Sequence, residues 1–311
     1  MQTEFAFFPG CVLTQAAKES KMALEAVAPR LGIKLKEIPG WSCCGASQAQ
    51  DVDPVATLVA NARNLALAEK MNLPVLTSCS TCLLMLRRAK AELDGGKKDR
   101  INTFLAKGNM HYAGTSEVTS LLWVLAQNAQ VLKSKVVRPL ANLKVAAFYG
   151  CHSLRPEHAL GFESAVNPTS FETVVAALGG QTVPFAKRLD SVCKIGVTEA
   201  KDGDKFKTGH AYVCPGGKHI GIRMRGPLPE IFVAEEPRDA LYKPSANVLF
   251  ETAGKAMARR TLGLILTGMG SDGCEGSKVL REKGGCLIAQ NEASCVVYGM
   301  PKAVVDNKLA N

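Results

Sequence analysis

Cysteine is the residue type through which this sequence of 311 residues could do chemistry, and five of its eleven cysteines follow a definite spacing. The spacing places 31 residues between Cys11 and the adjacent pair Cys43 and Cys44, and 34 residues between that pair and the Cys-x-x-Cys formed by Cys79 and Cys82. Thiolates are soft ligands that suit iron–sulfur clusters or zinc. Adjacent cysteines seldom form a disulfide with each other, because the backbone would be strained, but both can bind one cluster of several metals. Five thiolates exceed the four that a structural zinc takes, so the pattern favours iron and sulfur, with zinc or buried, disulfide-exchanging thiols as alternatives.

The elements that must position these cysteines alternate between strand and helix. Strands are expected at residues 4–8, 33–38 and 75–76, and helices at residues 18–31, 54–71 and 83–93. A polar loop is expected at residues 95–99. Such alternation predicts a parallel α/β sheet, whose ligands bind beyond the carboxyl ends of the strands. All five cysteines follow a strand, so we expect them to meet at that edge.

A second part of the chain repeats the beginning of the first. A strand expected at residues 145–148 leads into Cys151, as the strand before Cys11 does, and a helix at 170–178 and a strand at 182–185 follow. This indicates an internal repeat that ends near residue 190. A second Cys-Cys pair and a second Cys-x-x-Cys are missing, so Cys151 and Cys193 are interpreted as possible remnants of a second site.

Residues 1–190 resemble the B subunit of heterodisulfide reductase, in the form found in the heterodisulfide-reductase-like complexes of sulfur-oxidising prokaryotes. The resemblance rests on the five-cysteine CCG motif and on residues 7–11 (FFPGC), 41–46 (WSCCGA) and 148–156 (FYGCHSLRP). It implies one non-cubane [4Fe–4S] cluster on Cys11, Cys43, Cys44, Cys79 and Cys82, used in thiol/disulfide electron transfer. It also implies partnership with the C and A subunits of such a complex, the latter of which carries flavin, and a small thiol or disulfide substrate or a sulfur carrier protein. The family carries two such motifs, and only the first is complete here.

The end of the chain resembles a different family. Strands expected at residues 208–214, 262–266 and 286–289 end in loops, and a helix is expected to begin at Glu275. Residues 185–311 resemble the C-terminal part of the catalytic domain of the chemotaxis protein-glutamate methylesterase, through residues 185–190 (FAKRLD), 199–204 (EAKDGD), 211–219 (AYVCPGGKH), 264–273 (LILTGMGSDG) and 289–301 (AQNEASCVVYGMP). That family uses a Ser-His-Asp triad, whose acid corresponds to Asp272. The serine and the histidine belong upstream of the retained segment, and an acid alone only orients a histidine, so Asp272 is expected to be an inactive remnant. The remaining cysteines are interpreted as packed thiols: Cys214, Cys274, Cys286 and Cys295.

The predicted fold class is therefore α/β, a CCG-type unit plus a half-repeat joined to a truncated methylesterase-like parallel sheet with flanking helices. The expected domains are 1–142, the first CCG iron–sulfur domain; 143–190, a truncated second CCG repeat; and 191–311, a methylesterase-like region without the nucleophile strand. A truncated sheet exposes an edge. We expect the strands at 145–148 and 182–185 to pair with the C-terminal sheet and cover it.

The favoured function is that of an iron–sulfur oxidoreductase subunit in sulfur metabolism. The alternatives are a methylesterase-like hydrolase of chemoreceptors and a non-functional chimera. The net charge of +10 is spread evenly, without basic runs interleaved with aromatic residues, which argues against nucleic-acid binding. No uncharged apolar run approaches the ~20 residues of a membrane span, and no signal peptide is recognised, so a cytoplasmic location is expected.

Overall fold

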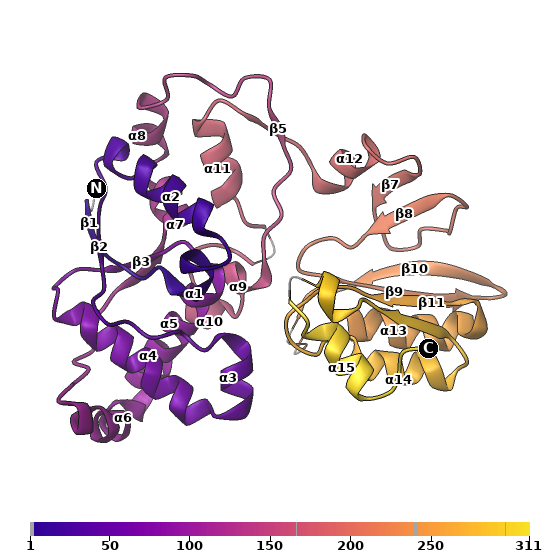
Figure 1. The fold of residues 1–311 in the computed structure, drawn as a ribbon. Coiled ribbons are helices and arrows are strands. Elements are labelled where there is room, and N and C mark those ends of the chain that lie inside the picture. The colour runs from indigo at the N-terminus through magenta and orange to yellow at the C-terminus, as the bar shows by residue number, and fades with distance from the viewer. Residues whose placement is uncertain (1–2, 166, 239, 241, 296) are drawn as a thin grey trace. The chain divides into compact units, whose positions relative to one another are not determined.

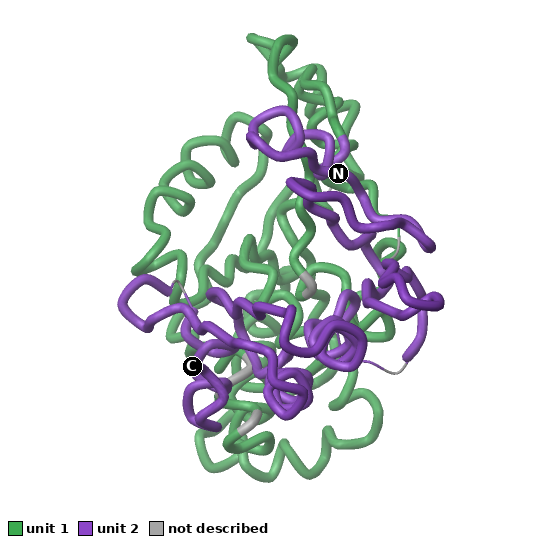
Figure 2. Tube along the Cα trace, turned by 90° about the vertical axis from the view of Figure 1, so that its right-hand side faces the viewer, with its two compact units in different colours: residues 1–183 green, residues 184–311 purple. Residues whose placement is uncertain are grey.

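The chain divides into two compact units, Met1–Val183 and Pro184–Asn311 (Figure 2). The computed structural model describes residues 3–165, 167–238, 240, 242–295 and 297–311, without the side chains of Ser47, Gln48, Asp51 and Cys151. Among the helices of these ranges, none combines the length and the apolar character that crossing a membrane requires.

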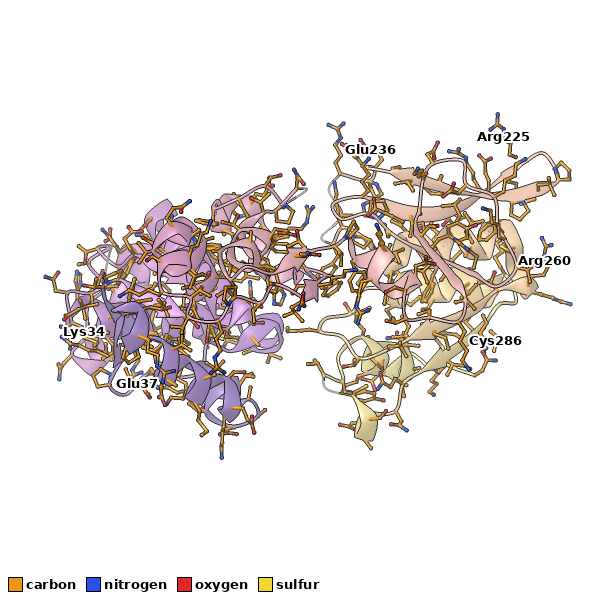
Figure 3. All side chains as sticks on the ribbon, turned by 90° about the horizontal axis from the view of Figure 1, so that it is seen from above. Lys34, Glu37, Arg225, Glu236, Arg260 and Cys286 are labelled. Atoms are coloured by element: carbon orange, nitrogen blue, oxygen red, sulfur yellow. The ribbon has the colours of Figure 1, made fainter. Side chains whose placement is uncertain are left out.

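A four-stranded parallel sheet organises the first unit, in the order β2-β1-β3-β4 (Figure 1). Its strands are β1 (Glu4–Phe7), β2 (Lys34–Glu37), β3 (Val75–Thr77) and β4 (Val118–Ser120). The central strand β1 is apolar and buried, whereas β2 is a charged edge strand whose Lys34 and Glu37 lie on the outside of the unit (Figure 3). The carboxylate of Glu4 forms ion pairs with Nζ of Lys34 and Nζ of Lys36 on that edge strand, at 2.8 and 3.2 Å. The strands predicted at 4–8, 33–38 and 75–76 are thus confirmed.

Helices cover both faces of this sheet, as buried parallel strands require. Ala6 of β1 belongs to a core shared with helices α4 and α5, while Phe5 and Phe7 on the other face pack with α2 and α7. The helices are α1 (Gly10–Thr14), α2 (Lys18–Val27), α3 (Ala46–Val52), α4 (Pro54–Glu69), α5 (Ser80–Glu92), α6 (Lys98–Leu105), α7 (Leu121–Gln127) and α8 (Ala129–Ser134), with the short turns η1 (Pro29–Leu31) and η3 (Ala106–Gly108).

The polar loop predicted at residues 95–99 is only partly confirmed, because the break between the helices is short. The wide turn η2 (Leu93–Lys97) connects α5 to α6, but Gly96 inside it is not helical, with a φ of 111° and a ψ of 1°. This glycine makes a kink between two helices, and Lys98 and Asp99 already belong to α6. Lys90 pairs with Asp94 at 3.1 Å across the junction.

The half-repeat folds as part of the first unit. It contains β5 (Lys144–Val145), α9 (Cys151–Leu154), α10 (Glu157–Leu160), α11 (Ser170–Ala177) and β6 (Gln181–Thr182). The two strands pair in parallel with each other, Lys144 opposite Gln181. The expected pairing of 145–148 and 182–185 with the C-terminal sheet is therefore wrong. Both strands are also shorter than predicted, since each has a partner on one side only and Pro184 starts helix α12 (Phe185–Asp190).

Helices α9 and α10 pack against α5 and cover it. Arg87 of α5 donates from Nε to the carbonyl of Ala159 at 2.7 Å and from a terminal nitrogen to the carbonyl of Val118 at 2.9 Å. Its guanidinium lies 5.4 Å from the ring centroid of Trp123, and that ring stacks on Phe162 at 4.6 Å. The half-repeat thus packs against helix α5, which carries part of the five-cysteine motif.

The second unit is built from three separate strand pairs. They are β7 (Gly196–Glu199) with β8 (His210–Val213), β9 (His219–Arg225) with β10 (Leu228–Ala234), and β11 (Leu262–Ile265) with β12 (Cys286–Ala289). The first and third pairs are parallel, and the second is an antiparallel hairpin that the sequence pattern did not reveal. The helices are α12, α13 (Ala246–Met257), α14 (Cys274–Glu282) and α15 (Met300–Asp306), with the turns η4 (Ala258–Arg260) and η5 (Glu292–Ser294).

One face of the pair β11–β12 is open. Ile265 and Leu287 point into a core with Phe250 of α13, whereas Leu262 and Leu264 remain more than half exposed. Parallel strands are ordinarily covered on both faces. The open surface is thus a face of this strand pair, which differs from the exposed sheet edge that the sequence predicted.

Candidate metal centre

The five spaced cysteines all lie beyond the carboxyl ends of neighbouring parallel strands. Cys11 is in α1, just after β1; Cys43 and Cys44 are in the loop after β2; Cys79 precedes the first residue of α5, after β3, and Cys82 is in its first turn. Because β2, β1 and β3 are adjacent and parallel, their loops open at one edge of the sheet.

The sulfur atoms of four of these residues contact one another in two pairs. The Sγ atoms of Cys43 and Cys11 are 3.5 Å apart, and those of Cys44 and Cys82 are also 3.5 Å apart. Cys43 and Cys44 are neighbours in the chain, and Cys79 precedes the helix that carries Cys82. The structure therefore places all five predicted sulfur ligands at one edge of the sheet, four of them in contacting pairs.

Burial is graded across this sulfur array. Cys44 and Cys82 are 2% and 3% exposed, Cys11 and Cys79 are half-buried, and Cys43 is exposed. Gly10 makes the inner contact possible: its φ is 69°, and a Cβ at this position would lie 2.7 Å from Cys82 Sγ. The array therefore has a closely packed inner wall, formed by Cys44 and Cys82, and a side open to solvent at Cys43.

Two of the thiols are poised to lose their protons. The hydrogen bond from Cys82 lowers the pKa of Cys79 to about 6, helped by the backbone N–H groups at the start of α5. The same thiol lowers the pKa of Cys44, and its own pKa is raised by donating to both. Although the Cys43 residue is exposed, partial desolvation of its sulfur, together with the neighbouring Cys11 and Cys44, raises the pKa of Cys43 to about 11. Metal ligation needs thiolates. Because Cys82 donates a hydrogen bond to Cys79 and to Cys44, it favours the thiolate form of both.

Helix α4 holds the loop of the Cys-Cys pair through two buried asparagines. Asn64 accepts from the backbone N–H of Ser42 at 2.9 Å and donates to its carbonyl at 2.9 Å. Asn61 donates to the carbonyl of Cys44 at 3.0 Å. Neither asparagine was singled out from the sequence. Two asparagines three residues apart on the apolar face of a helix could have indicated amides that hydrogen-bond to a neighbouring loop.

The donor set fits a cluster of several irons. Five soft sulfur donors at one sheet edge are the ligands that iron–sulfur clusters use. Within the described ranges, no group of three or more His, Cys, Asp or Glu side chains is arranged to hold a metal ion. The sulfur contacts along the edge are two pairs, Cys11–Cys43 and Cys44–Cys82.

His152 of α9 reaches this site from the half-repeat. Its Nδ1 lies 3.0 Å from Oγ1 of Thr81, inside the Cys-x-x-Cys. Burial, together with the charge of Arg88, lowers the pKa of His152, so the ring is neutral. Nothing in the local sequence links two residues 71 positions apart, and this contact was missed.

The predicted remnants of a second site, Cys151 and Cys193, are not tested by the described residues. Cys151 begins α9, and its side chain lies outside the described residues. Cys193 belongs to the second unit, in the exposed turn after α12. Their role as remnant ligands stays a prediction.

Of the C-terminal cysteines, Cys274 is buried and Cys214 and Cys295 are half-buried, but Cys286 is exposed (Figure 3). The packed position expected for Cys286 is wrong because it lies opposite Leu262 on the open pair β11–β12.

Asp272 caps helix α13. It accepts from Oγ of Ser245 at 2.8 Å and from the backbone N–H groups of Ala246 and Asn247 at 2.6 and 3.3 Å. His219 is fully buried, accepts at Nδ1 from the N–H of Ser245 at 3.2 Å, and lies 3.2 Å from the carbonyl of Pro237 through Nε2. These partners give His219 the Nε2–H tautomer and a structural role, and they use the Asp272 carboxylate to satisfy a helix N-terminus.

Comparison with known proteins also finds two parts, although the second match begins within the first compact unit. The cysteine-rich domain family matches residues 5–87, and the CheB methylesterase family matches residues 165–311. The 8-methylmenaquinol:fumarate reductase membrane anchor subunit of Wolinella succinogenes is 80% identical over 190 residues, which is 61% of this chain and 67% of that protein.

The second part is similar to methylesterases. A protein-glutamate methylesterase/protein-glutamine glutaminase of Lawsonia intracellularis is 62% identical over 130 residues, 42% of this chain and 36% of that protein. The chain thus spans about a third of the length of this relative. The crystal structure of the Thermotoga maritima CheB methylesterase catalytic domain matches with a TM-score of 0.39 and 34% identity, over 40% of this chain and 67% of that one. The chain carries a cysteine-rich domain followed by a CheB methylesterase region, and through the former it belongs to the family of the 8-methylmenaquinol:fumarate reductase membrane anchor subunit.

Proposed function

We propose that the first unit binds one iron–sulfur cluster and transfers electrons as part of a redox complex of several subunits. The observation that carries this proposal is the gathering of the five cysteines at one edge of the parallel sheet, with the sulfur pairs Cys11–Cys43 and Cys44–Cys82 in contact. The proposed ligands are Cys11, Cys43, Cys44, Cys79 and Cys82. When bound, a cluster of this kind accepts and releases single electrons.

The finer form of the proposal is thiol/disulfide chemistry at a non-cubane four-iron cluster, as the resemblance to the B subunit of heterodisulfide reductase implies. Reduction of a disulfide consumes two electrons and two protons and releases two thiols, so the electrons must come from a partner. The flavin-bearing A subunit and the C subunit of a heterodisulfide-reductase-like complex are the proposed partners, and a small disulfide or a sulfur carrier protein is the proposed substrate. The exposed Cys43 is the side at which substrate would arrive.

A groove of about 650 Å³ lies beside the residues that precede Cys43 in the chain. Its lining includes Gly40, Trp41, Ser42, Asp53 and Arg63, but not Cys43 itself. The lining is mostly apolar, and Arg63 also donates to the carbonyl of Gly40 at 2.8 Å. A mostly apolar groove with a few polar groups is suited to a small thiol or disulfide.

The relative's name, a membrane anchor subunit, extends the proposal to a complex attached to a membrane. The cytoplasmic location expected from the sequence stays a prediction. Cell fractionation distinguishes a chain in a membrane-attached complex from a cytoplasmic chain. A chain held at the membrane by partner subunits is expected in the membrane fraction at low salt and should leave it at high salt, when the complex dissociates.

Cysteine substitution tests the site itself. Anaerobic reconstitution of Cys44→Ser and Cys82→Ser is expected to lower bound iron per chain at least tenfold, because the inner wall loses a ligand. Cys286→Ser, exposed in the second unit, is the matched control and should retain iron. Equal iron in all three variants would contradict the assignment.

A methylesterase function is the second candidate, because residues 165–311 match that family and contain Asp272. The partners of Asp272 in this structure are the start of α13, which supports a capping role rather than a catalytic one. Release of methanol from a methylated chemoreceptor, abolished by Asp272→Ala, would support the esterase. A chain with neither iron nor esterase activity would support the non-functional chimera.

A further inference from the structure

Besides its open face, the strand pair β11–β12 has an outer edge at which backbone groups lack partners. In a parallel pair, alternate residues of a strand bond to the partner strand, and the residues between them direct their backbone groups away from it. Ile265 bonds to β12, since its carbonyl accepts from the N–H of Gln290 at 2.8 Å. Leu262 and Leu264 therefore point their N–H and C=O groups to the outer edge of β11, where the described part of the chain offers them no hydrogen-bond partner.

The outer edge of β12 is closed by contrast. The N–H of Asn311 donates to the carbonyl of Leu287 at 2.8 Å, and the side-chain oxygen of Asn311 accepts from the N–H of Leu287 at 2.7 Å. The edge of β11 is therefore the one at which this sheet can accept a further strand.

The side chains along β11 suit such an addition. Leu262, Leu264 and Leu266 are 57%, 54% and 61% exposed, and Ile288, which lies opposite Leu264, is 48% exposed. Residues 261–267 contain neither a charge nor a proline, which are the devices that ordinarily keep an edge strand from pairing. An added strand with apolar side chains on one face would cover this row of leucines.

Cations gather at the start of the same edge, in the turns that lead from α13 into β11 and from α14 into β12. They are Arg259, Arg260, Arg281 and Lys283. The two turns are in contact, because a Cβ at Gly284 would lie 3.0 Å from Cγ of Arg259. Arg260 lies on the outside of the second unit (Figure 3). Among the described residues none of these four cations forms an ion pair, and Glu282 is the one carboxylate in the two turns.

We propose that the outer edge of β11 is a docking site for an extended, acidic segment of a partner protein, which adds to the sheet as a strand and pairs its carboxylates with Arg259 and Arg260. Main-chain hydrogen bonds to Leu262 and Leu264 supply affinity, and the cations at one end fix the direction of the added strand. This inference concerns the second unit and does not rest on the proposed iron–sulfur function of the first.

Two other occupants match the edge less well. A second copy of the chain has no acidic residue between Arg259 and Ser271, so its own β11 brings no carboxylate to the cations. An anionic lipid surface would match the cations, but it would leave the backbone groups of Leu262 and Leu264 without partners, which is costly in hydrocarbon. An acidic strand satisfies both the cations and the backbone.

The first experiment uses the full chain unaltered and varies only the probe. A fluorescent peptide that alternates valine and threonine after two N-terminal glutamates is titrated with the chain, and its anisotropy is expected to rise to saturation. N-methylation of every second amide removes either the donors that face β11 or those that face solvent. One of the two methylated peptides should therefore bind about tenfold or more weakly, and the other should bind as before. Absence of binding, or equal binding of both methylated peptides, would overturn the proposal.

The second experiment reverses the charges. The double variant Arg259→Glu and Arg260→Glu is expected to bind the acidic peptide about tenfold more weakly, and to bind a peptide with two N-terminal lysines in its place. Binding of the lysine peptide also shows that the variant is folded. Lys207→Glu, exposed between β7 and β8, is the matched control. Equal weakening in the control would indicate attraction to net charge alone and would overturn the proposed site.

The third experiment tests the other two occupants on the same full chain. Sedimentation of the chain alone is expected to show a monomer, and vesicles of phosphatidylglycerol are expected to leave the bound peptide in place. A dimer that dissociates as the peptide binds would assign the edge to a second copy. Displacement of the peptide by the vesicles would assign it to lipid. Either result would overturn the proposal.

Discussion

Replacing Gly10 with alanine tests whether the close approach of α1 to Cys82 is needed to hold the cluster. A Cβ at Gly10 would lie 2.7 Å from Cys82 Sγ. Non-bonded heavy atoms pack best at about 3.5–4.0 Å, so the sulfur must retreat by roughly 1 Å. Distances in metal sites tolerate only about 0.2 Å. Cys82 is 3% exposed and already 3.5 Å from Cys44 Sγ, so the retreat displaces a second ligand as well.

Gly32 provides the matched control for this substitution. Its φ of 76° is close to the 69° of Gly10, but a Cβ there meets no atom within 4 Å. Both alanine variants should lose roughly 1–2 kcal/mol of stability from the left-handed backbone. Only Gly10→Ala should also weaken iron binding, by about tenfold or more. The test measures iron per chain after anaerobic reconstitution, and urea unfolding measures the stability of each variant. Equal iron in the two variants would refute the reasoning.

Three further perturbations follow from the described contacts. Glu69 accepts from the backbone N–H groups of residues 113–116 at 2.7–3.2 Å, so Glu69→Ala should lower the free energy of unfolding by about 2–4 kcal/mol in urea, and a loss below about 0.5 kcal/mol would contradict this role. A hydrogen bond from a neighbouring thiol lowers the pKa of Cys79 to about 6, while partial desolvation of its sulfur raises the pKa of Cys43 to about 11. In the iron-free protein at pH 7, Cys79 should therefore be the thiolate and react faster with iodoacetamide, its rate falling as the pH drops through 6; equal rates for the two would argue against it. Asp272→Asn removes an acceptor from the start of α13 and should destabilise the second unit by about 1–3 kcal/mol, seen by urea unfolding; unchanged stability would exclude the capping role.

The arrangement of the five cysteines could be predicted because it depends on local pattern. The apolar run of β1 and the charged alternation of β2 identify a central and an edge strand, and helices of ordinary length separate them. Once the strands are parallel, the cysteines that follow them must share one edge. The shortness of the break at Gly96, a kink rather than a loop of five residues, was not predictable in this way, because two glycines in a polar stretch are equally typical of a longer loop.

The contacts of the half-repeat could not be read from the sequence. Arg87 meets Ala159 across 72 residues, and only the packed surface of α5 determines that meeting. The pairing of the short strands β5 and β6 with each other could not be predicted either. Strands of two residues are too short to show an alternation of apolar and polar residues from which a partner could be inferred. Tertiary packing, rather than local propensity, decides both features.

The most direct test of the central claim is iron and sulfide analysis of the anaerobically reconstituted full chain, combined with EPR of its oxidised and reduced forms. The five-cysteine site predicts about four iron and four sulfide per chain and a signal that appears in only one of the two redox states. A colourless protein that binds zinc alone, without sulfide or an EPR signal, would contradict the claim that these cysteines hold an iron–sulfur cluster.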